Sequence, residues 1–361
     1  MIRCSRCVMP NTRPDTPFEN GVCSACLSFE KRQAIDWTGR KRELELLLER
    51  GKNSSGFDCI VPSSGGKDSH WQVLTLLDLG AKPLVVTATT CHLTETGRKN
   101  IENLARYAAT VQFTPKRDVR RKLNVSAMEL VGDISWPEHV SIFTTPFRAA
   151  VDLGIPLVFY GENPQEAYGG PRGSDEARVM TRRWVSEFGG FLGLRVSDFE
   201  REGFDMTEYR PPTDEDLEVG GVEAHFLGAY YEWDSHRNAL IARGSGFLAR
   251  VPCQANLWDH ENLDNAQTGL HDYAMFRKFG YGRGCAQASV DVRLGRMTRV
   301  EALQWVQEHD GAFPHVYAGV PVDEVLDALG KGRTWLEAQL DTYTNWALFP
   351  NGLPDQSKAT L

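Results

Sequence analysis

A glycine-containing loop, SSGGKDS at residues 63–69, is the feature that most restricts how this chain of 361 residues can fold. It follows an apolar run and leads directly into a helical pattern, so it predicts a turn from a strand into a helix. The two glycines let backbone N–H groups approach an anion, and the N-terminus of the helix adds its dipole. The loop therefore predicts a phosphate site; the simpler alternative is an ordinary capped glycine turn.

The loop matches neither of the two common phosphate-binding patterns. Lys67 is followed by Asp68, and position 61 is valine, so the P-loop pattern of NTPases fails, and G-x-G-x-x-G fails too. The hydroxyls of Ser64 and Ser69 can donate to phosphate. Because an aspartate repels phosphate, Asp68 is expected to hold the magnesium ion that accompanies it, with Lys67 as a secondary catalytic candidate.

Strand and helix patterns alternate after residue 57. The predicted strands are 58–62, 83–88, 111–113 and 155–160, and the predicted helices include 69–79 and 94–109. Alternation of this kind favours a parallel sheet with helices on both faces, an α/β fold. Ligands in such sheets bind at the carboxyl ends of the strands, where the strand order reverses.

Four of the eight cysteines form two C-x-x-C pairs, Cys4 with Cys7 and Cys23 with Cys26, with fifteen residues between the pairs. Two such pairs can complete a closed, structural zinc site with four thiolates. The alternatives are two local disulfides or four unligated thiols. About thirty residues are too few to fold on an apolar core alone, so we expect the metal to stabilise them.

Composition and charge narrow the class of protein. An apolar content of 41% is typical of a globular chain, and a net charge of −8 disfavours a general nucleic-acid binder. The start, MIRCSRCVMP, has no apolar signal core, and no segment reaches the ~18 apolar residues of a membrane span. We therefore expect a cytoplasmic protein without a membrane span or a nucleic-acid partner.

The motif S-G-G-x-D-S resembles the loop of the PP-loop, or N-type, ATP pyrophosphatases, whose fold is adenine-nucleotide α-hydrolase-like. The resemblance implies that ATP is cleaved between its α and β phosphates and that AMP is left on an acceptor oxygen. It also implies that the strand at 155–160 lies beside the first strand. Gly161, Glu162 and Asn163 would then face the loop across a crevice; alone, this GEN triplet could be a plain strand-end turn.

Longer stretches resemble one family almost end to end, the N-acetyl sugar amidotransferases of lipopolysaccharide and flagellin-glycan biosynthesis. These stretches are CSRCVMPNTRPD, CSAC, SGGKDS, GENPQEAYGG, LGAYYEWDSHRN and WDHENLDNAQTGLHDYAMFRKFGYGRGCAQASVDVRLGRMTR. The resemblance implies that the acetamido oxygen of a nucleotide-activated N-acetyl sugar is adenylated and that ammonia then displaces AMP, which gives an acetamidino sugar. It also implies a glutaminase and a barrel subunit, similar to those of imidazole glycerol phosphate synthase, as partners that supply ammonia.

The resemblance also implies the site. The expected catalytic residues are Asp68, Lys67 and Asn163; the expected ATP-binding residues are Ser64, Gly65, Gly66, Lys67, Asp68, Ser69, Thr87 and Gly161. The expected substrate-binding residues are Glu162, Asn163, Glu166 and Tyr168. In GENPQEAYGG an alanine separates Glu166 from Tyr168, whereas family members often place these two side by side. The cofactors expected are ATP, Mg²⁺ and structural Zn²⁺.

Four regions follow from these patterns. They are a zinc ribbon at 1–30, a connecting helix and linker at 31–56, a PP-loop ATP pyrophosphatase domain at 57–200 and a mainly helical region for substrate or partners at 201–361. In the last region, Thr298 with Glu301 and Thr334 with Glu337 are predicted to be capping boxes that open two helices. Polar clusters such as 259–261 and 271–272 are candidates for sugar or ammonia contacts or for surface groups, and His260 and His271 have no clear metal spacing.

Two other functions stay open from the sequence. One is a PP-loop sulfurtransferase that acts on tRNA, although that chemistry normally needs a reactive cysteine pair or an iron–sulfur cluster near its active site. The other is a zinc-ribbon scaffold without enzymatic activity, which would not require an intact SGGKDS. A test of tRNA against nucleotide sugars separates the first from an amidotransferase, and turnover of ATP to AMP excludes the second.

Overall fold

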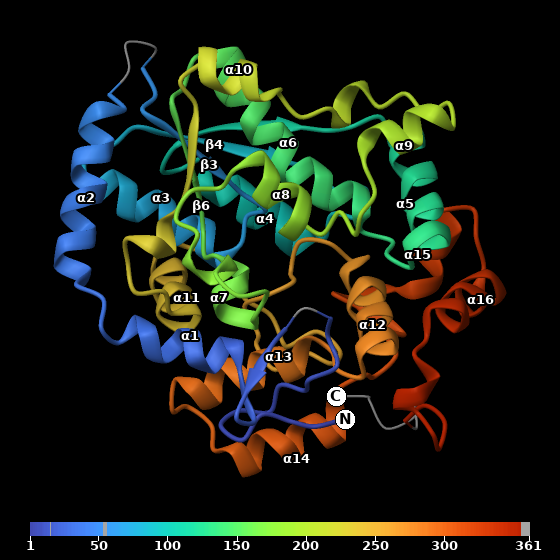
Figure 1. The fold of residues 1–361 in the computed structure, drawn as a ribbon. Helices are drawn as coiled ribbons and strands as arrows, with labels where there is room; N and C mark the ends of the chain where they lie inside the picture. The colour runs from blue at the N-terminus through green and yellow to red at the C-terminus, as the bar shows by residue number, and fades with distance from the viewer. Residues whose placement is uncertain (15, 53–55, 355–361) are drawn as a thin grey trace.

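The computed structural model describes residues 1–14, 16–52 and 56–354, and a parallel sheet of five strands forms its centre (Figure 1). The strands are β3 (Cys59–Pro62), β4 (Pro83–Ala88), β5 (Ala109–Phe113), β6 (Leu157–Tyr160) and β7 (Glu223–Phe226). Their order is β5-β4-β3-β6-β7, and every neighbouring pair is parallel. The predicted α/β fold with a parallel sheet is confirmed, as is the position of the strand at 155–160 beside the first strand.

The strand order reverses between β3 and β6. From β3 the chain moves outward through β4 to β5, and it then returns to the other side of β3 to add β6 and β7. The helix after β3 is α3 (Lys67–Asp78), and the helix after β4 is α4 (Glu95–Leu104). The glycine loop therefore lies at the carboxyl end of β3, at the switch point where ligands bind in sheets of this kind.

Both faces of the sheet are covered by helices, because the strands are apolar on both sides. Val61 of β3 belongs to a core with α2 (Trp37–Arg50) and α3, whereas its neighbour Ile60 packs with α6 (Trp136–Leu153) on the opposite face. Helix α11 (Ser235–Gly244) lies against α3. These layers fix the direction in which the loop after β3 emerges.

One strand of the sheet lies beyond residue 200, within the segment that we expected to be mainly helical. Strand β7 has only four residues, EAHF, and pairs with β6 from Leu157↔Glu223 to Tyr160↔Phe226. A stretch this short, with a polar residue at its start, gives little periodic signal of its own, so its strand character depends on the neighbouring β6. The predicted region boundaries stay a prediction, but the sheet continues past residue 200.

The remaining helices surround this sheet and extend below it in Figure 1. Those that lie between β5 and β7 in the chain are α5 (Arg117–Val131), α7 (Pro164–Tyr168), α8 (Arg182–Phe188), α9 (Val196–Arg201) and α10 (Asp214–Val219). The C-terminal ones are α12 (Thr268–Phe279), α13 (Arg283–Arg293), α14 (Arg299–His309), α15 (Val322–Ala328) and α16 (Arg333–Tyr343), with a hairpin of β8 (Val316–Tyr317) and β9 (Val320–Pro321). Short 3₁₀ helices occupy Ser174–Glu176, Thr207–Tyr209, Leu227–Ala229 and Trp346–Leu348.

The two predicted capping boxes have different outcomes. Thr298 accepts from the backbone N–H of Glu301, and the Glu301 carboxylate accepts from Thr298, so the first box is confirmed. The second is wrong, because α16 already begins at Arg333 with Gly332 as its N-cap residue. Thr334 therefore lies inside the first turn, where it cannot cap the helix.

The N-terminal segment packs against the C-terminal helices rather than standing apart. It contains β1 (Phe18–Glu19), β2 (Val22–Cys23) and α1 (Ser24–Arg32), and its four paired cysteines share a buried core with α13 and α14. The guanidinium of Arg299 donates to the carbonyl oxygens of Cys4 and Cys7 at 3.0–3.1 Å. Arg293 donates to the carbonyl oxygen of Ala167, which ties α13 to α7.

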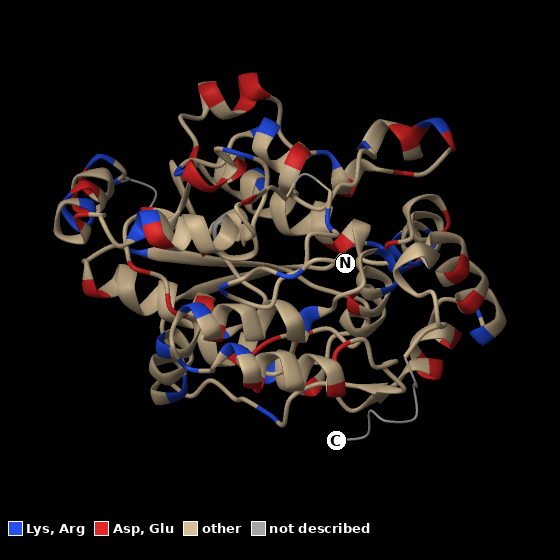
Figure 2. Ribbon diagram, turned by 60° about the horizontal axis from the view of Figure 1, so that its bottom comes forward, with Lys and Arg blue, Asp and Glu red and all other residues tan. Residues whose placement is uncertain are grey.

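No helix within the described residues is long and apolar enough to cross a membrane. In the ribbon of Figure 2, positions of Lys and Arg are interspersed with positions of Asp and Glu along the helices. The negative net charge is therefore spread over the molecule in this view.

Candidate functional site

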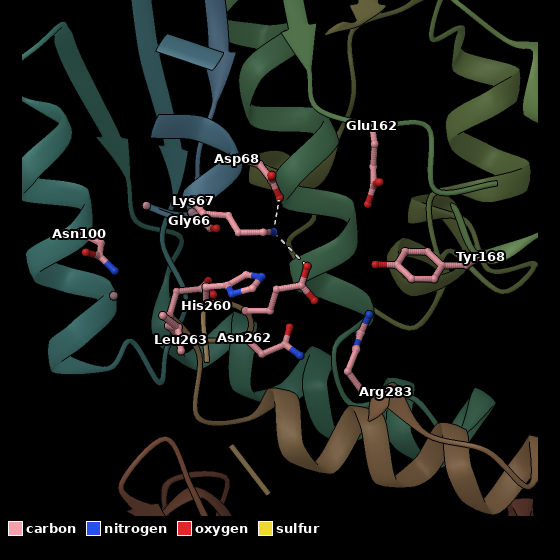
Figure 3. A pocket seen from close by; sticks show the side chains of 15 residues that line it. Gly66, Lys67, Asp68, Asn100, Glu162, Tyr168, His260, Asn262, Leu263 and Arg283 are labelled. Atoms are coloured by element: carbon pink, nitrogen blue, oxygen red, sulfur yellow. Dashed lines mark hydrogen bonds and ion pairs between the residues drawn. The ribbon is translucent and has the colours of Figure 1, made fainter. Parts of the chain in front are cut away.

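A cavity of about 300 Å³ opens at the carboxyl end of β3, between the glycine loop and the C-terminal region (Figure 3). One wall consists of residues 64–68, and the facing wall consists of residues 260–264 and Arg283. Gly97 and Asn100 of α4 and the side chains of Glu162 and Tyr168 complete the lining. Two parts of the chain that are far apart in sequence therefore form one site.

The conformation of the loop depends on its first glycine. Gly65 has a φ of +81°, in the left-handed region, and a Cβ atom there would lie 2.8 Å from the backbone nitrogen of Ile101. Any other residue at this position would be strained and would also clash. Gly66 follows in an extended conformation as the N-cap residue of α3, so the loop delivers Lys67 and Asp68 into the first turn of that helix.

The ammonium group of Lys67 bridges two carboxylates. Its Nζ atom lies 2.6 Å from Asp68 Oδ2 and 3.0 Å from Glu261 Oε1, and the residue is only 2% exposed. Burial alone would lower the pKa of Lys67, but the two carboxylates raise it above its ordinary value. Burial alone would raise the pKa of Glu261, but Lys67 and Gln287 lower it to about 2. Lys67 and Glu261 are therefore a charged pair in the wall of the cavity.

Asp68 is positioned from two sides. Its Oδ2 atom accepts from Lys67, and its Oδ1 atom accepts from the side-chain amide of Asn238 at 3.1 Å. The carboxylate still lines the cavity and is 31% exposed, so lone pairs remain for a further ligand. Carboxylate oxygen is a ligand that Mg²⁺ prefers, and Asp68 therefore fits the predicted magnesium role.

The two predicted serines differ in position. Ser64 lines the cavity. Ser69 is buried; its hydroxyl donates to the Gly66 carbonyl oxygen at 3.0 Å and contacts the Ser63 hydroxyl at 2.9 Å. Ser69 thus stabilises the loop from behind and is not part of the cavity lining among the described residues.

The C-terminal wall is anchored to the start of α4. The backbone N–H of Thr94 donates to the Asp264 carbonyl oxygen at 2.9 Å, and the Thr94 hydroxyl donates to that of Leu263. A Cβ atom at Gly97 would lie 2.5 Å from the Cα of Asp264, so the two segments approach as closely as a glycine permits. These contacts fix residues 260–264 over the glycine loop.

Two predicted substrate residues, Glu162 and Tyr168, line the cavity opposite Lys67 (Figure 3). The Tyr168 hydroxyl points into the space between Glu162 and Arg283. Burial raises the pKa of Tyr168 well above its ordinary value, and the nearby carboxylates of Glu261 and Glu162 act in the same direction. Its hydroxyl is therefore protonated and can donate a hydrogen bond. The side chain of Glu166 lies outside what the structure describes.

Asn163, for which a catalytic and substrate-binding role was predicted, is not in the described lining of the cavity. Its Nδ2 donates to the carbonyl oxygens of Ser174 at 2.9 Å and Ala177 at 3.3 Å, and its Oδ1 caps α7 through the Gln165 N–H. The side chain is 3% exposed. An amide with both ends engaged in this way positions the loop that carries Tyr168.

The other two predicted ATP-binding residues, Gly161 and Thr87, are also not in the described lining of this cavity. A Cβ atom at Gly161 would lie 3.0 Å from the ring of Trp233, so this glycine serves close packing at the end of β6. Thr87 lies in β4 with 1% exposure, and its hydroxyl has no hydrogen-bond partner among the described residues.

Arg283 is a site residue that the sequence did not single out, and Glu261 was named only within the polar cluster 259–261, with a surface role as the alternative. Arg283 donates to Asp272 from Nη2 at 2.9 Å and from Nε at 3.2 Å, which holds its guanidinium at the cavity wall. Both residues lie in the long stretch that carries the family resemblance, and their place in that stretch was the sequence signal that could have identified them as site residues. Among the described lining residues, four are acidic (Asp68, Glu162, Glu261 and Asp264) and two carry a permanent positive charge (Lys67 and Arg283).

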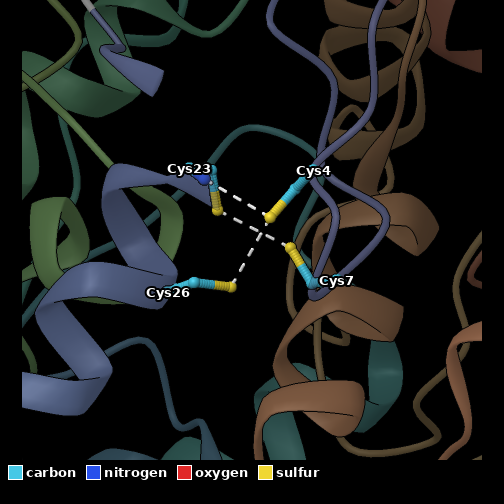
Figure 4. A group of neighbouring side chains, drawn as sticks. All are labelled: Cys4, Cys7, Cys23 and Cys26. Atoms are coloured by element: carbon cyan, nitrogen blue, oxygen red, sulfur yellow. Dashed lines mark hydrogen bonds between the residues drawn. The ribbon is translucent and has the colours of Figure 1, made fainter. Parts of the chain in front are cut away.

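The four paired cysteines converge as predicted (Figure 4). The sulfur atoms of Cys4 and Cys26 are 3.9 Å apart and those of Cys7 and Cys23 are 3.6 Å apart, so they are not disulfides. Tetrahedral zinc with Zn–S bonds of about 2.3 Å places its sulfur ligands about 3.8 Å apart. Backbone N–H groups of Arg6 and Cys23 donate to the Cys4 sulfur, which favours a thiolate there. The cluster therefore fits a structural zinc ion.

A second group with metal-ligating side chains contains Asp133, His139 and His271. His271 Nδ1 lies 2.8 Å from Asp133 Oδ1, and His139 Nδ1 lies 3.9 Å from Asp133 Oδ2. The short contact is that of a hydrogen-bonded His–Asp pair, which joins α12 to the turn before α6. The carboxylate of Asp133 counters the effect of burial and raises the pKa of His271.

A comparison with protein families gives a match in the C-terminal part of the chain. Residues 247–357 match the family described as "LPS biosynthesis protein WbpG-like, C-terminal domain". Residues 247–357 are similar to this domain and form a WbpG-like region of the chain. This match confirms the resemblance to proteins of lipopolysaccharide biosynthesis, and it assigns the wall with Glu261 and Arg283 to the WbpG-like region. A comparison with curated proteins gave no match.

Among solved structures, the chain is similar to NMN synthetase from Francisella tularensis. The similarity covers 60% of this chain and 99% of that chain, with 15% sequence identity and a TM-score of 0.28. At this score, the fold assignment rests on the strand order and on the position of the SGGKDS loop in the sheet.

Proposed function

We propose that this protein is an ATP-dependent amidotransferase that converts the acetamido group of a nucleotide-linked N-acetyl sugar into an acetamidino group, in the biosynthesis of a bacterial surface polysaccharide. One observation carries this proposal: the SGGKDS loop and the WbpG-like region form the two walls of one cavity. A phosphate-binding loop that faces a region of a lipopolysaccharide biosynthesis family supports the use of ATP on a sugar substrate.

The chemistry explains why ATP is needed. An amide carbonyl is a poor electrophile, and its oxygen does not leave as hydroxide. In the proposed reaction the amide oxygen attacks the α-phosphorus of ATP and releases pyrophosphate. Ammonia then adds to the activated carbon, and the C–O bond breaks with its electron pair, so that AMP leaves. In such reactions the protein contributes mainly positioning and neutralisation of charge.

The residues of the cavity have separate roles in this proposal. Backbone N–H groups of the glycine loop and the start of α3 would hold the phosphates, since a helix N-terminus favours anions. Lys67 would offset charge on the phosphate oxygens. Glu162 and Tyr168 would hold the sugar on the opposite side, because carboxylate and hydroxyl groups can accept from and donate to its polar groups.

The charge of the cavity supports a role for magnesium in this proposal. The cavity contains more acidic than basic groups, so bare ATP would be repelled by it. A magnesium ion on Asp68 would supply charge neutralisation for the departing pyrophosphate.

The tRNA sulfurtransferase alternative gains no support from the cavity. Among the described residues that line it there is no cysteine. The four paired cysteines are instead used together at the N-terminus. The amidotransferase proposal is therefore preferred.

One experiment tests the proposal directly. The protein is incubated with ATP, Mg²⁺, ammonium and a panel of nucleotide-activated N-acetyl sugars, and the products are analysed by mass spectrometry. We expect AMP, pyrophosphate and a sugar in which one O is replaced by NH. AMP formation with tRNA and a sulfur donor, without any change in the sugars, would contradict the proposal and support the sulfurtransferase.

A further inference from the structure

His260 stands in the wall of the ATP cavity as part of a hydrogen-bonded His–Asp pair. Its Nδ1 atom lies 3.0 Å from Asp259 Oδ1, and the residue is 4% exposed. Because an ionised carboxylate can only accept hydrogen bonds, Nδ1 carries the hydrogen and donates it to Asp259. The lone pair of the neutral ring is therefore on Nε2.

The Nε2 atom of His260 is buried and has no hydrogen-bond partner among the described residues. A buried acceptor without a partner costs free energy, and such groups are uncommon in native proteins. Since His260 is part of the cavity lining, a ligand in the cavity is the natural source of the missing donor. The unpaired nitrogen thus points to a group that arrives with the substrates.

Neighbouring groups hold the ring and its partner in place. Trp258 stacks on the His260 ring, with centroids 5.4 Å apart and an angle of 18° between the rings. Arg243 donates to both carboxylate oxygens of Asp259, at 2.6 and 2.7 Å. Burial would raise the pKa of Asp259, but Arg243 and His260 lower it, so this carboxylate stays ionised. Asp259 is therefore a positioning residue for His260.

The charged groups around His260 favour its neutral form at pH 7. Burial lowers the pKa of the ring, and Lys67 and His236 act in the same direction, whereas Glu261 and Asp259 oppose them. The balance keeps the pKa below its ordinary value. A neutral ring with a free nitrogen, on a residue that lines the cavity, can accept a proton.

We propose that His260 is the general base that removes a proton from ammonia as it attacks the activated sugar; this inference rests on the proposed function. When ammonia adds to the carbon of the adenylated amide, its nitrogen becomes positively charged. His260 Nε2 takes one proton from that nitrogen, and AMP leaves with the electron pair of the C–O bond. The products are an amidinium group, AMP and an imidazolium that Asp259 stabilises.

The test separates the two halves of the reaction. Adenylation is measured without ammonia, as exchange of labelled pyrophosphate into ATP in the presence of the sugar substrate, and amidine formation is measured with ammonia. In His260→Gln we expect exchange to be unchanged and amidine formation to fall about 100-fold, the lower end for loss of a general base. The acid limb of the wild-type pH profile for amidine formation should disappear in this variant.

The neighbouring His236 provides a matched control. It packs against the same Trp258, but its Nε2 is engaged by Asp291 at 2.8 Å, and it is not in the described lining of the cavity. We expect His236→Gln to keep both activities; because His236 contacts His260 and helps to lower its pKa, the acid limb should move to higher pH but should not disappear. Asp259→Asn, which keeps the ring, is expected to reduce amidine formation alone.

Three results would overturn this role. Equal loss of exchange and amidine formation in His260→Gln, with an unchanged melting temperature, would assign His260 to ATP binding instead. Full amidine formation in that variant would exclude the role outright. A wild-type protein that catalyses neither exchange nor amidine formation would overturn the proposed function together with it.

Discussion

Lys67 Nζ and Glu261 Oε1 lie 3.0 Å apart, although 194 residues separate them in the chain. This pair connects the glycine loop to the WbpG-like region in the interior of the cavity. Because the pair is buried, removal of one partner should lower the free energy of unfolding far more than removal of one partner of an exposed pair would.

The first prediction concerns this pair. Lys67→Met leaves the carboxylates of Asp68 and Glu261 without their shared cation, and we expect the free energy of unfolding to fall by about 3 kcal/mol. The double variant Lys67→Met/Glu261→Gln should recover part of this loss, because one uncompensated charge is removed. Thermal and urea unfolding measure both effects. The matched control is Lys52→Met, which breaks an exposed pair with Glu49 and should cost less than about 1 kcal/mol. Equal effects of the two single variants would show that the buried pair does not contribute.

The second prediction concerns Asp68. Asp68→Asn changes little volume and can still hydrogen-bond, but it removes the charge that would face magnesium. We expect AMP formation to fall by about 100-fold or more with an unchanged melting temperature. Asp78→Asn, an exposed change on the same helix, is the control and should have wild-type turnover. Wild-type turnover in Asp68→Asn would remove this residue from the site.

The third prediction is about zinc. We expect one zinc ion per chain in reducing buffer by elemental analysis, and a strongly reduced content in Cys23→Ser, because one of four ligands is lost. The melting temperature should fall as well, since the metal stabilises a segment with a small core of its own. Cys91→Ser, a cysteine outside the cluster, should keep its zinc. Unchanged zinc in Cys23→Ser, or none in the wild type, would refute the site.

The fourth prediction is a dependence of stability on pH. Burial raises the pKa of Asp264 to about 6, above the value of about 3.9 in an unfolded chain. Between pH 4 and pH 6 the folded state binds a proton at Asp264 that the unfolded state does not. The contribution of Asp264 to the free energy of unfolding is therefore fully present below pH 4 and is lost as the pH rises towards 6. In Asp264→Asn the free energy of unfolding should fall by about 1–2 kcal/mol less between pH 4 and pH 6 than it does in the wild type.

The comparison between wild type and Asp264→Asn is needed because Asp310 acts in the same direction. Burial raises its pKa to about 6 as well, so it should keep part of the slope in the variant. Urea unfolding at pH 4, 5, 6 and 7 gives both profiles. Parallel profiles for the two proteins would show that Asp264 ionises freely.

The fifth prediction concerns the nitrogen donor. We propose that ammonia comes from a separate glutaminase with a barrel subunit, and we therefore expect glutamine alone to be inert with the purified chain. High ammonium at alkaline pH should support amidine formation, because more of it is then unprotonated. Release of glutamate from glutamine by the isolated protein, with transfer of its nitrogen, would contradict this prediction.

The sequence predicts the centre of the fold well because its signals there are local. The apolar strands and the glycine loop each stand in a short continuous stretch, and their alternation predicts the parallel sheet, whereas the place of the strand at 155–160 beside β3 was implied by the family resemblance. Strand β7 is harder to predict from the sequence, because the stretch EAHF becomes a strand only through its pairing with β6. Thr334 shows a similar limit: its spacing to Glu337 fits a capping box, but the preceding Gly332 starts the helix earlier.

The site could be predicted in part: loop residues 64–68, Glu162 and Tyr168 were all predicted and all line the cavity. Residues 64–68 carry a motif, whereas Glu261 and Arg283 acquire their roles from a contact between distant parts of the chain. Asn163 is the converse case. Its place after a strand suggested a ligand contact, but its amide is fully engaged by the backbone around Ser174. Whether a polar side chain after a strand faces a ligand or its own loop depends on tertiary packing.

The division of the cavity between two distant segments has a consequence for synthesis. The loop with Lys67 leaves the ribosome first, and the wall with Glu261 follows 194 residues later. Until then a nascent chain carries the glycine loop without the surface that closes over it. A prematurely terminated product that lacks residues 247–357 would do the same. The proposed binding of a nucleotide in this cavity would therefore require that both segments have been made and have folded together.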